Sequence, residues 1–223
     1  MKKRRNPRTL LFPYLLLALA ALPGSIGLAA PTEVVQAARD GLAPFLEGIP
    51  PADRAGYGLE PEDRVEDADL GEPFQLYAVD PRALLAAGEE TTVGEIVSPT
   101  ETWFFPVEID GQPRNILTVT RMNGAWEAVA LGKAPLAREL GAVRRRWVPA
   151  GYQPRLVAVY QAAAYFFTLP ELDDYNFTPL NFSGRGFAPD LKTGPGYPDT
   201  TELDQILNKL QADVAENLRT QDF

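Results

Sequence analysis

Carboxylates, guanidinium groups, lysine amines and a few hydroxyls are the side chains with which this sequence could do chemistry. The 223 residues include no histidine and no cysteine. The chain therefore lacks the usual general base at neutral pH, the usual thiol nucleophile and the ligands of ordinary zinc sites. Ser25 lies in the N-terminal segment, and neither Ser98 nor Ser183 lies in a G-x-S-x-G turn. Histidine-dependent serine enzymes and zinc hydrolases are excluded, and no cofactor is predicted.

Carboxylates are abundant, with 30 Asp and Glu residues in the chain. A glycosidase needs only two of them a few ångströms apart, so a carboxylate-dependent glycan hydrolase stays open as an alternative function. Two oxygen-rich segments are candidate metal sites, one with Asp67 and Asp69 and the other with Asp173 and Asp174. Neither segment has the ligand order of a calcium loop. We therefore interpret both as solvated surface and predict no metal site.

Aromatic and basic residues supply the remaining candidates for ligand binding. Trp103 and Trp126 would form a ligand platform if they shared an exposed face of a sheet, although packing in the core is the simpler role for them. The run Arg144, Arg145 and Arg146 could dock an acidic partner. The alternative is that these arginines solvate the end of a helix, where positive charge is favoured by the helix dipole.

The elements that must position these residues centre on residues 103–132, which read as three strands. Asp110-Gly111 and Asn123-Gly124 separate the apolar runs and supply the positive φ angles of tight hairpin turns. Within the runs, apolar and polar residues alternate with the period of a strand. The pattern predicts an antiparallel meander with at least one covered face.

Helices and further strands are predicted on both sides of this meander. Apolar stripes at helical spacing indicate helices over 32–47 and 133–147, and a third within 200–223. Residues 74–79 read as a strand, and the apolar run 156–169 as a central strand or two short strands bent near 162–164. Residues 91–97 favour a short strand. The predicted fold class is α+β: an antiparallel meander sheet of about 5–6 strands packed against an N-terminal helix and a second amphipathic helix, with a C-terminal helix.

The first 29 residues have the pattern of a secretory signal peptide. Five basic residues precede an almost wholly apolar run, and small residues lead to a cleavage site near Ala29. An uncleaved anchor is the alternative, because residues 9–30 are long enough to span a bilayer. The predicted organisation is a signal peptide over 1–29, an α+β domain over 30–170, a Pro/Gly-rich loop or tether over 171–199 and a C-terminal helix over 200–223. The predicted location is secreted or periplasmic, with no stable membrane span after cleavage.

Charge restricts the partners of the mature chain. Residues 1–29 contain five Lys/Arg and no Asp/Glu, so residues 30–223 have 21 − 5 = 16 basic and 30 acidic residues, a net charge of −14. Nucleic acid and anionic lipid are therefore excluded as expected partners, since both require a positive surface. An extracytoplasmic protein is the expected partner, and the sequence leaves the oligomeric state open.

One local resemblance adds to this interpretation. The segments Phe105-Pro106-Val107, Asp110-Gly111 and Asn123-Gly124-Ala125-Trp126, with the strand 116–120 between them, resemble secreted peptidase propeptides and PepSY-like modules. The resemblance covers about 30 of the 223 residues. Such modules combine a helix with an antiparallel sheet and restrain or escort proteases, which implies a non-catalytic binding role. No functional residue can be transferred from it.

Three hypotheses about function follow. The leading one is an exported non-enzymatic binding or accessory protein, in a protease-inhibiting or propeptide-like role. The second is the carboxylate-dependent hydrolase, acting on glycans of the cell envelope or the extracellular space. The third is a structural envelope protein that assembles through the apolar stripe of its C-terminal helix.

Overall fold

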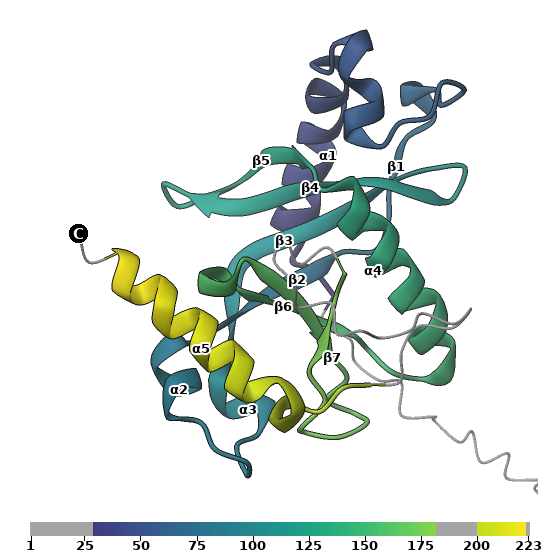
Figure 1. Ribbon diagram of the computed structural model, residues 1–223. Coiled ribbons are helices and arrows are strands. Elements are labelled where there is room, and N and C mark those ends of the chain that lie inside the picture. The colour runs from purple at the N-terminus through teal and green to yellow at the C-terminus, as the bar shows by residue number, and fades with distance from the viewer. Residues whose placement is uncertain (1–28, 182–199, 222–223) are drawn as a thin grey trace, which may run out of the picture.

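A single mixed sheet organises the chain, whose computed structural model describes residues 29–181 and 200–221. The strands follow the order β5, β4, β3, β2, β6, β7 and β8, and β1 also pairs with β3 (Figure 1). Neighbouring strands are antiparallel except β2 and β6, which run parallel. The strands are β1 (Asp69–Leu70), β2 (Phe74–Val79), β3 (Val97–Ile109), β4 (Gln112–Met122), β5 (Ala125–Gly132), β6 (Arg155–Val159), β7 (Ala164–Thr168) and β8 (Thr178–Pro179). The α+β class and the mainly antiparallel sheet are confirmed.

The predicted meander is β3, β4 and β5. Its two turns have positive φ at Asp110 (52°), Gly111 (69°), Asn123 (51°) and Gly124 (88°), as the Asp-Gly and Asn-Gly pairs require. Strand β3 begins at Val97, six residues before the predicted first strand. It is longer than predicted because β2 pairs along its first half, with a register shift after Gln75.

Five helices cover the described part of the sheet: α1 (Thr32–Glu47), α2 (Pro81–Ala86), α3 (Val93–Ile96), α4 (Ala134–Trp147) and α5 (Leu203–Gln221). Short 3-10 turns occupy Pro51–Tyr57, Val65–Asp67, Val148–Ala150 and Tyr160–Ala162. Helices α1 and α4 lie on opposite faces of the meander. Trp103 and Phe105 pack toward α1, whereas Phe104 packs toward α4, because successive strand residues point to opposite faces.

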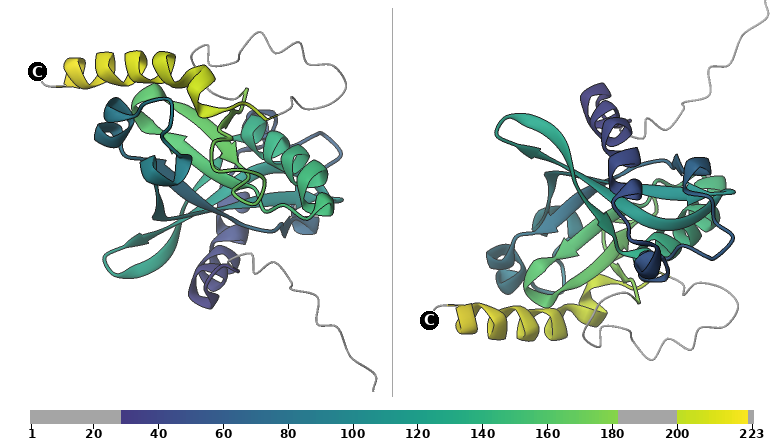
Figure 2. Two further views of the ribbon diagram at one scale, coloured as in Figure 1. Left: turned by 90° about the horizontal axis from the view of Figure 1, so that it is seen from below. Right: turned by 90° about the horizontal axis from the view of Figure 1, so that it is seen from above.

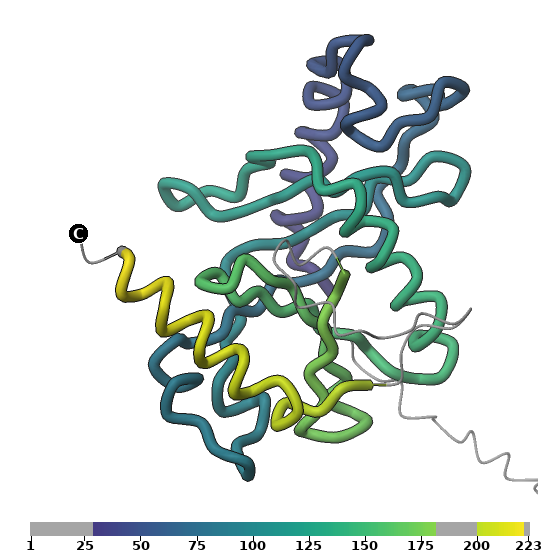
Figure 3. The backbone as a smooth tube through the Cα atoms, viewed as in Figure 1, coloured from purple at the N-terminus to yellow at the C-terminus, as the bar shows by residue number. Residues whose placement is uncertain are grey.

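Helix α5 packs against the β6–β7 end of the sheet. Its buried residues Leu203, Leu207, Leu210 and Val214 share a cluster with Val157 and Phe166. Gln211 Nε2 also donates to the carbonyl oxygens of Leu84 and Ala87 at 2.9 and 3.0 Å, so α5 and residues 81–87 lie side by side (Figure 3). By strand register, α5 covers the same face of the sheet as α1. The sheet twists so strongly that the two helices lie on opposite sides of the molecule in Figure 2.

One local expectation was wrong, and one of the two alternatives left open for another segment was confirmed. Residues 91–97 do not form a strand: Val93–Ile96 is the short helix α3, because Thr92 and Glu95 form a capping box at its start. The run 156–169 forms two antiparallel strands, β6 and β7, joined by a 3-10 turn and by Ala163 at φ 49°. The turn lies at the bend that the sequence allowed near 162–164.

The described part of the predicted loop or tether packs on the sheet. Phe177 stacks on Phe166 with ring centroids 4.4 Å apart, and Leu180 is buried. The buried Asn176 amide holds the backbone of this segment, donating to the carbonyl oxygens of Leu169 at 2.9 Å and Asp173 at 2.7 Å. Residues 182–199 and the predicted signal peptide, apart from Ala29, lie outside the described residues.

Candidate functional site: an arginine-lined pocket

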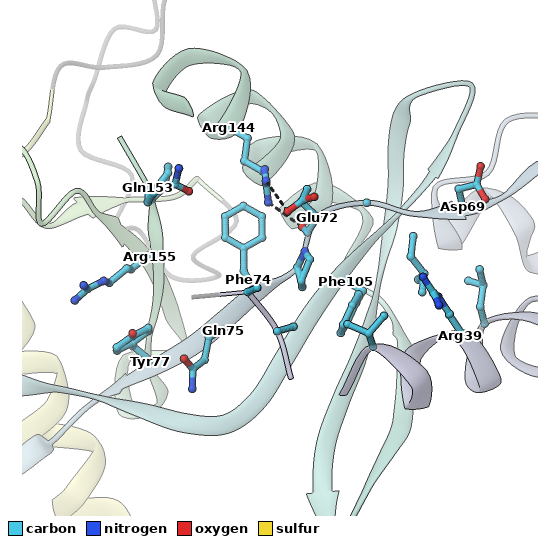
Figure 4. Close-up of a pocket in the computed structure, with 18 of the residues that line it drawn as sticks. Arg39, Asp69, Glu72, Phe74, Gln75, Tyr77, Phe105, Arg144, Gln153 and Arg155 are labelled. Carbon is cyan, nitrogen blue, oxygen red and sulfur yellow. Dashed lines mark hydrogen bonds and ion pairs between the residues drawn. The ribbon is translucent and has the colours of Figure 1, made fainter. Parts of the chain in front are cut away.

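A pocket of about 860 Å³ opens on the α1 face of the sheet. It extends from α1, across the first residues of β2 and β6, to the last turn of α4 (Figure 4). Three arginines from three different elements line it: Arg39 of α1, Arg144 of α4 and Arg155 of β6. We call this cavity the arginine pocket. Its volume lies within the range of sites that bind small ligands or short peptide segments.

The parallel pairing of β2 with β6 creates the floor of the arginine pocket. Leu76 and Leu156 are buried on the opposite face, toward α4, while Gln75, Tyr77 and Arg155 reach the surface of the pocket from the two strands. Gln75 Nε2 donates to Thr100 O at 3.2 Å, and this hydrogen bond fixes the side-chain amide. The floor therefore combines fixed polar groups with a rigid sheet.

Arg144 forms one wall of the pocket. Its guanidinium lies 5.1 Å from the centre of the Phe74 ring, donates to the Glu72 carbonyl at 2.9 Å and pairs with the Glu72 carboxylate at 3.6 Å. Burial lowers the pKa of Arg144, while the charge of Glu72 opposes that shift. Arg144 thus ties the end of α4 to the segment before β2 and keeps its charge.

Arg155 and Arg39 differ from Arg144 because they have no acidic partner among the described residues. Arg155 is exposed and its guanidinium lies 5.5 Å from the centre of the Tyr77 ring. Such stacking on an aromatic ring orients the side chain and leaves its N–H groups free to donate. Arg39 is exposed on α1, and Figure 4 places it and Arg155 at opposite ends of the pocket.

Three carboxylates also line the pocket, and all three are exposed. Glu72 pairs with Arg144, and its side chain is 80% exposed. Glu171 accepts a hydrogen bond from the Gln153 backbone N–H at 3.3 Å. Asp69 lies in β1 toward the end of the pocket near Arg39 (Figure 4). Nothing in this arrangement places a carboxyl in the apolar surroundings that keep a catalytic acid protonated.

The two tryptophans do not form an exposed platform. Trp103 is only 4% exposed and packs under α1, as its predicted role in the core required. Trp126 is half-buried in the edge strand β5 and packs against the same cluster. The rings therefore stabilise the contact between the meander and α1.

The three arginines Arg144, Arg145 and Arg146 point in different directions from helix α4, so they do not form one site. Of the three residues only Arg144 lines the pocket. Arg145 and Arg146 are exposed, and the guanidinium of Arg146 lies 4.9 Å from the centre of the Trp147 ring. Consecutive helical residues point about 100° apart, so three adjacent arginines cannot share one site.

The acidic residues proposed as metal ligands are separated in space and in role. Asp67 pairs with Arg64 at 3.4 Å. Asp69 instead lines the pocket, and Asp173 accepts backbone hydrogen bonds from Tyr175 and Asn176. The Asp174 carbonyl accepts from the Val93 N–H at 2.8 Å. Among residues 29–181 and 200–221, no three Asp, Glu, His or Cys side chains gather in a geometry that would hold a metal ion.

Sequence reasoning missed Arg39, Gln75, Tyr77, Gln153 and Arg155 as site residues. They come from three separate stretches of the chain, at residue 39, residues 75–77 and residues 153–155, and belong to no motif. The one available signal was the position of Arg155, a charged residue directly before a long apolar strand. Only the pairing of β2 with β6 shows that it stands beside Tyr77.

No helix in the described part of the chain combines the length and the apolar character that crossing a membrane requires. Comparisons of the chain with protein-family models, with curated proteins and with solved structures found no match.

Proposed function

We propose that this chain is an exported, non-enzymatic binding or accessory protein whose ligand occupies the arginine pocket. The observation that carries the proposal is a cavity of about 860 Å³ with two exposed guanidinium groups, Arg39 and Arg155, that no acid in the described residues neutralises. Cations held without a partner at the rim of a concave site favour an anionic ligand group. Restraint of a protease, which the local resemblance implies, is one form that such an accessory role would take.

The chemistry of the pocket supports binding better than hydrolysis. A glycosidase needs one carboxyl that stays protonated at neutral pH and a second that is ionised, on either side of the bond to be broken. Asp69, Glu72 and Glu171 are all exposed, and Glu72 is already held by Arg144. The chain also lacks histidine, which could otherwise replace the protonated carboxyl.

Assembly through the C-terminal helix is less well supported than binding. The apolar stripe proposed for assembly is buried within the chain, with Leu203, Leu207, Leu210 and Val214 no more than 5% exposed. An assembling helix would have to leave the sheet first and expose that stripe. The burial of four such side chains contributes roughly 6–12 kcal/mol, which opposes undocking.

The proposal is tested with purified residues 30–223 and a randomised pool of blocked hexapeptides. The protein is immobilised, and the retained peptides are recovered and analysed by mass spectrometry. We expect the wild-type protein to retain a subset of the pool and to return every peptide intact. The doubly substituted variant Arg39→Gln/Arg155→Gln should no longer retain that subset of peptides.

Arg138→Gln is the matched control, because Arg138 is exposed on α4 and does not line the pocket. It removes a positive charge without changing the cavity. Equal retention by the wild-type protein and the double variant would refute a ligand site in the arginine pocket. Recovery of cleaved peptides would refute the non-enzymatic assignment.

A further inference from the structure

Each aromatic ring of the arginine pocket is either stacked with a guanidinium group or buried, which leaves little open ring face for a sugar. The guanidinium of Arg144 covers the Phe74 ring, and that of Arg155 covers the Tyr77 ring. Phe105, the third ring of the lining, is only 2% exposed. Sites for oligosaccharides depend on aromatic faces that are open for stacking, so the pocket is poorly built for a glycan.

The free cations are spread along the pocket instead of converging on one point. Arg39 projects from α1 at one end and Arg155 from β6 at the other, with Phe105, Gln75 and Phe74 between them (Figure 4). A single small anion cannot contact both guanidinium groups in this arrangement. A ligand that uses both must be elongated and must have acidic groups at two separated positions.

The surface between the two arginines can accept the backbone of an extended chain. The Gln75 amide is fixed by its bond to Thr100 O, and Gln153 reaches the pocket beside Arg155. At the α1 end, Val35 and Leu42 add apolar surface next to Arg39. Amide groups that pair with peptide groups, together with apolar surface for alternate side chains, are the elements by which proteins bind extended peptides.

The carboxylates of the pocket do not cancel this preference for an acidic ligand. Glu72 is paired with Arg144, and Glu171 accepts a backbone N–H. Among the lining acids, Asp69 is the one whose carboxylate has no hydrogen bond or ion pair within the described residues, whereas two lining guanidinium groups, those of Arg39 and Arg155, have no ion pair there. The three lining arginines and the three lining carboxylates balance in formal charge, so the preference for an acidic ligand rests on Arg39 and Arg155, whose guanidinium groups have no ion-pair partner within the described residues.

From these contacts we infer that the arginine pocket binds an acidic peptide segment in an extended conformation, with carboxylates on Arg39 and Arg155. This inference rests on the proposed function and names its ligand class. The pocket would contact the charge and the backbone of its ligand, which are features of a protein segment and not of one particular small molecule. We therefore assign the segment to another protein. A partner that exposes an acidic loop or terminus has the required chemistry.

The test compares four probes of matched length against residues 30–223 by fluorescence anisotropy. The probes are blocked, labelled hexapeptides that alternate alanine with glutamate, glutamine or lysine, and a labelled hexamer of galacturonic acid. We expect the glutamate peptide to bind most tightly. Arg39→Gln and Arg155→Gln should each weaken its binding about three- to tenfold, the range expected for losing one charge-assisted contact. Arg138→Gln should change it less than about twofold.

A second variant separates orientation from charge at Arg155. Arg155→Lys keeps the positive charge but loses the planar group that stacks on Tyr77, so it should retain only part of the affinity. If Arg155→Lys and Arg155→Gln bind the glutamate peptide as well as the wild-type protein does, the inferred contact is wrong.

The remaining outcomes distinguish this inference from the proposed function. One of the other three probes could bind more tightly than the glutamate peptide and lose that binding in the double variant Arg39→Gln/Arg155→Gln. This result would keep the pocket as a binding site but overturn the acidic peptide as its ligand. No binding of the glutamate peptide, while the randomised pool is still retained in a pocket-dependent manner, would also overturn the inference alone. If no probe binds and no peptide of the pool is retained in a pocket-dependent manner, both the inference and the proposed function are overturned.

Discussion

At the scale of single residues, Asp63 is buried, unlike the exposed acids Asp67 and Asp69 that follow it in the chain. The Asp63 side chain is only 2% exposed and pairs with Arg114 at 2.7 Å. Its other oxygen accepts the Glu60 backbone N–H at 2.7 Å. Asp63 therefore anchors the segment between α1 and β2 to strand β4, where Arg114 is 19% exposed.

Asp63→Asn should destabilise the protein by about 2–4 kcal/mol, because it leaves the largely buried Arg114 with only its 3.6 Å pair to Glu60. Urea unfolding of residues 30–223 measures the loss. Asp67→Asn is the control: the pair of Asp67 with Arg64 is at least half exposed on both sides and should contribute less than about 1 kcal/mol. Equal effects of the two substitutions would contradict the assigned role of Asp63.

The Thr92–Glu95 capping box predicts a pH dependence. Hydrogen bonds from the Thr92 backbone N–H and hydroxyl lower the pKa of Glu95 below its ordinary value of 4.5. A carboxyl whose pKa is lower in the folded state stabilises that state above its unfolded pKa, and this contribution is lost as the pH falls through the folded pKa. Glu95→Gln should therefore reduce stability at pH 7, and its difference from the wild type should shrink toward about pH 3.

Unfolding curves of the wild type and Glu95→Gln, measured at several pH values, check this expectation. Glu90→Gln serves as the control, because Glu90 is exposed and takes no part in the capping box. A difference between wild type and Glu95→Gln that does not change with pH would show that the carboxylate charge is not what stabilises α3.

At the scale of elements, α1 is held unusually close to the edge strand β5. A Cβ atom on Gly41 would overlap the Cβ of Ala128, so the glycine is needed for this approach. That explains why a glycine stands in the middle of a helix, where it costs about 1 kcal/mol relative to alanine. The helix is positioned by this contact, and Arg39 is positioned with it.

Gly41→Ala should lower stability by about 1–2 kcal/mol, since overpacking outweighs the gain in helix propensity. The double variant Gly41→Ala/Ala128→Gly should recover part of the loss, because it restores space at the contact. In α3, a Cβ on Gly94 would meet nothing within 4 Å, so Gly94→Ala should be neutral or stabilising. A stabilising Gly41→Ala would show that α1 does not approach β5 this closely.

A substitution in helix α5 distinguishes packing of this helix on its own sheet from assembly of several chains through it. Leu210 is fully buried against the sheet, so Leu210→Ala should cost about 2–5 kcal/mol without changing the molecular mass in solution. Leu85, 40% exposed, gives the control substitution Leu85→Ala, with a loss below about 1 kcal/mol. Dissociation of a larger species on Leu210→Ala, with monomer stability unchanged, would instead support assembly through α5.

At the scale of the whole molecule, residues 30–223 have a net charge of −14 by the count above, with 16 basic and 30 acidic residues. Like charges repel one another in the compact state, and salt screens this repulsion. Salt also screens the attraction between an acidic peptide and the arginine pocket. Stability and binding should therefore respond to salt in opposite directions.

Raising sodium chloride from about 20 to about 300 mM, which shortens the Debye length from roughly 20 to 6 Å, should increase the Tm of residues 30–223 and weaken binding of the glutamate hexapeptide. Calorimetry and anisotropy in the same buffers measure the two effects. Binding of the glutamine hexapeptide, which lacks charge, is the control and should change little. A Tm that falls with salt would contradict the repulsion argument.

The sequence predicted the local features of this fold and missed the features that depend on distant pairing. Asp-Gly and Asn-Gly specified both turns of the meander, and the apolar stripes located α1, α4 and α5 within a few residues. The predicted strand over 91–97 failed because the Thr92–Glu95 cap outweighed β propensity. Of the candidate site residues, Arg144 and Asp69 line the pocket, whereas Trp103 packs in the core.

The amino-acid sequence by itself determined which chemistry is absent, where the turns fall and which helix faces are apolar, because these depend on residue type and on spacing within one element. Only the tertiary structure decided that β2 pairs in parallel with β6 and that α1 and α4 flank the strand ends. That arrangement brings Arg39, Tyr77 and Arg155 to one cavity. No local pattern records it, since parallel pairing of strands separated by about 80 residues is selected by the packing of the whole core and not by any short segment.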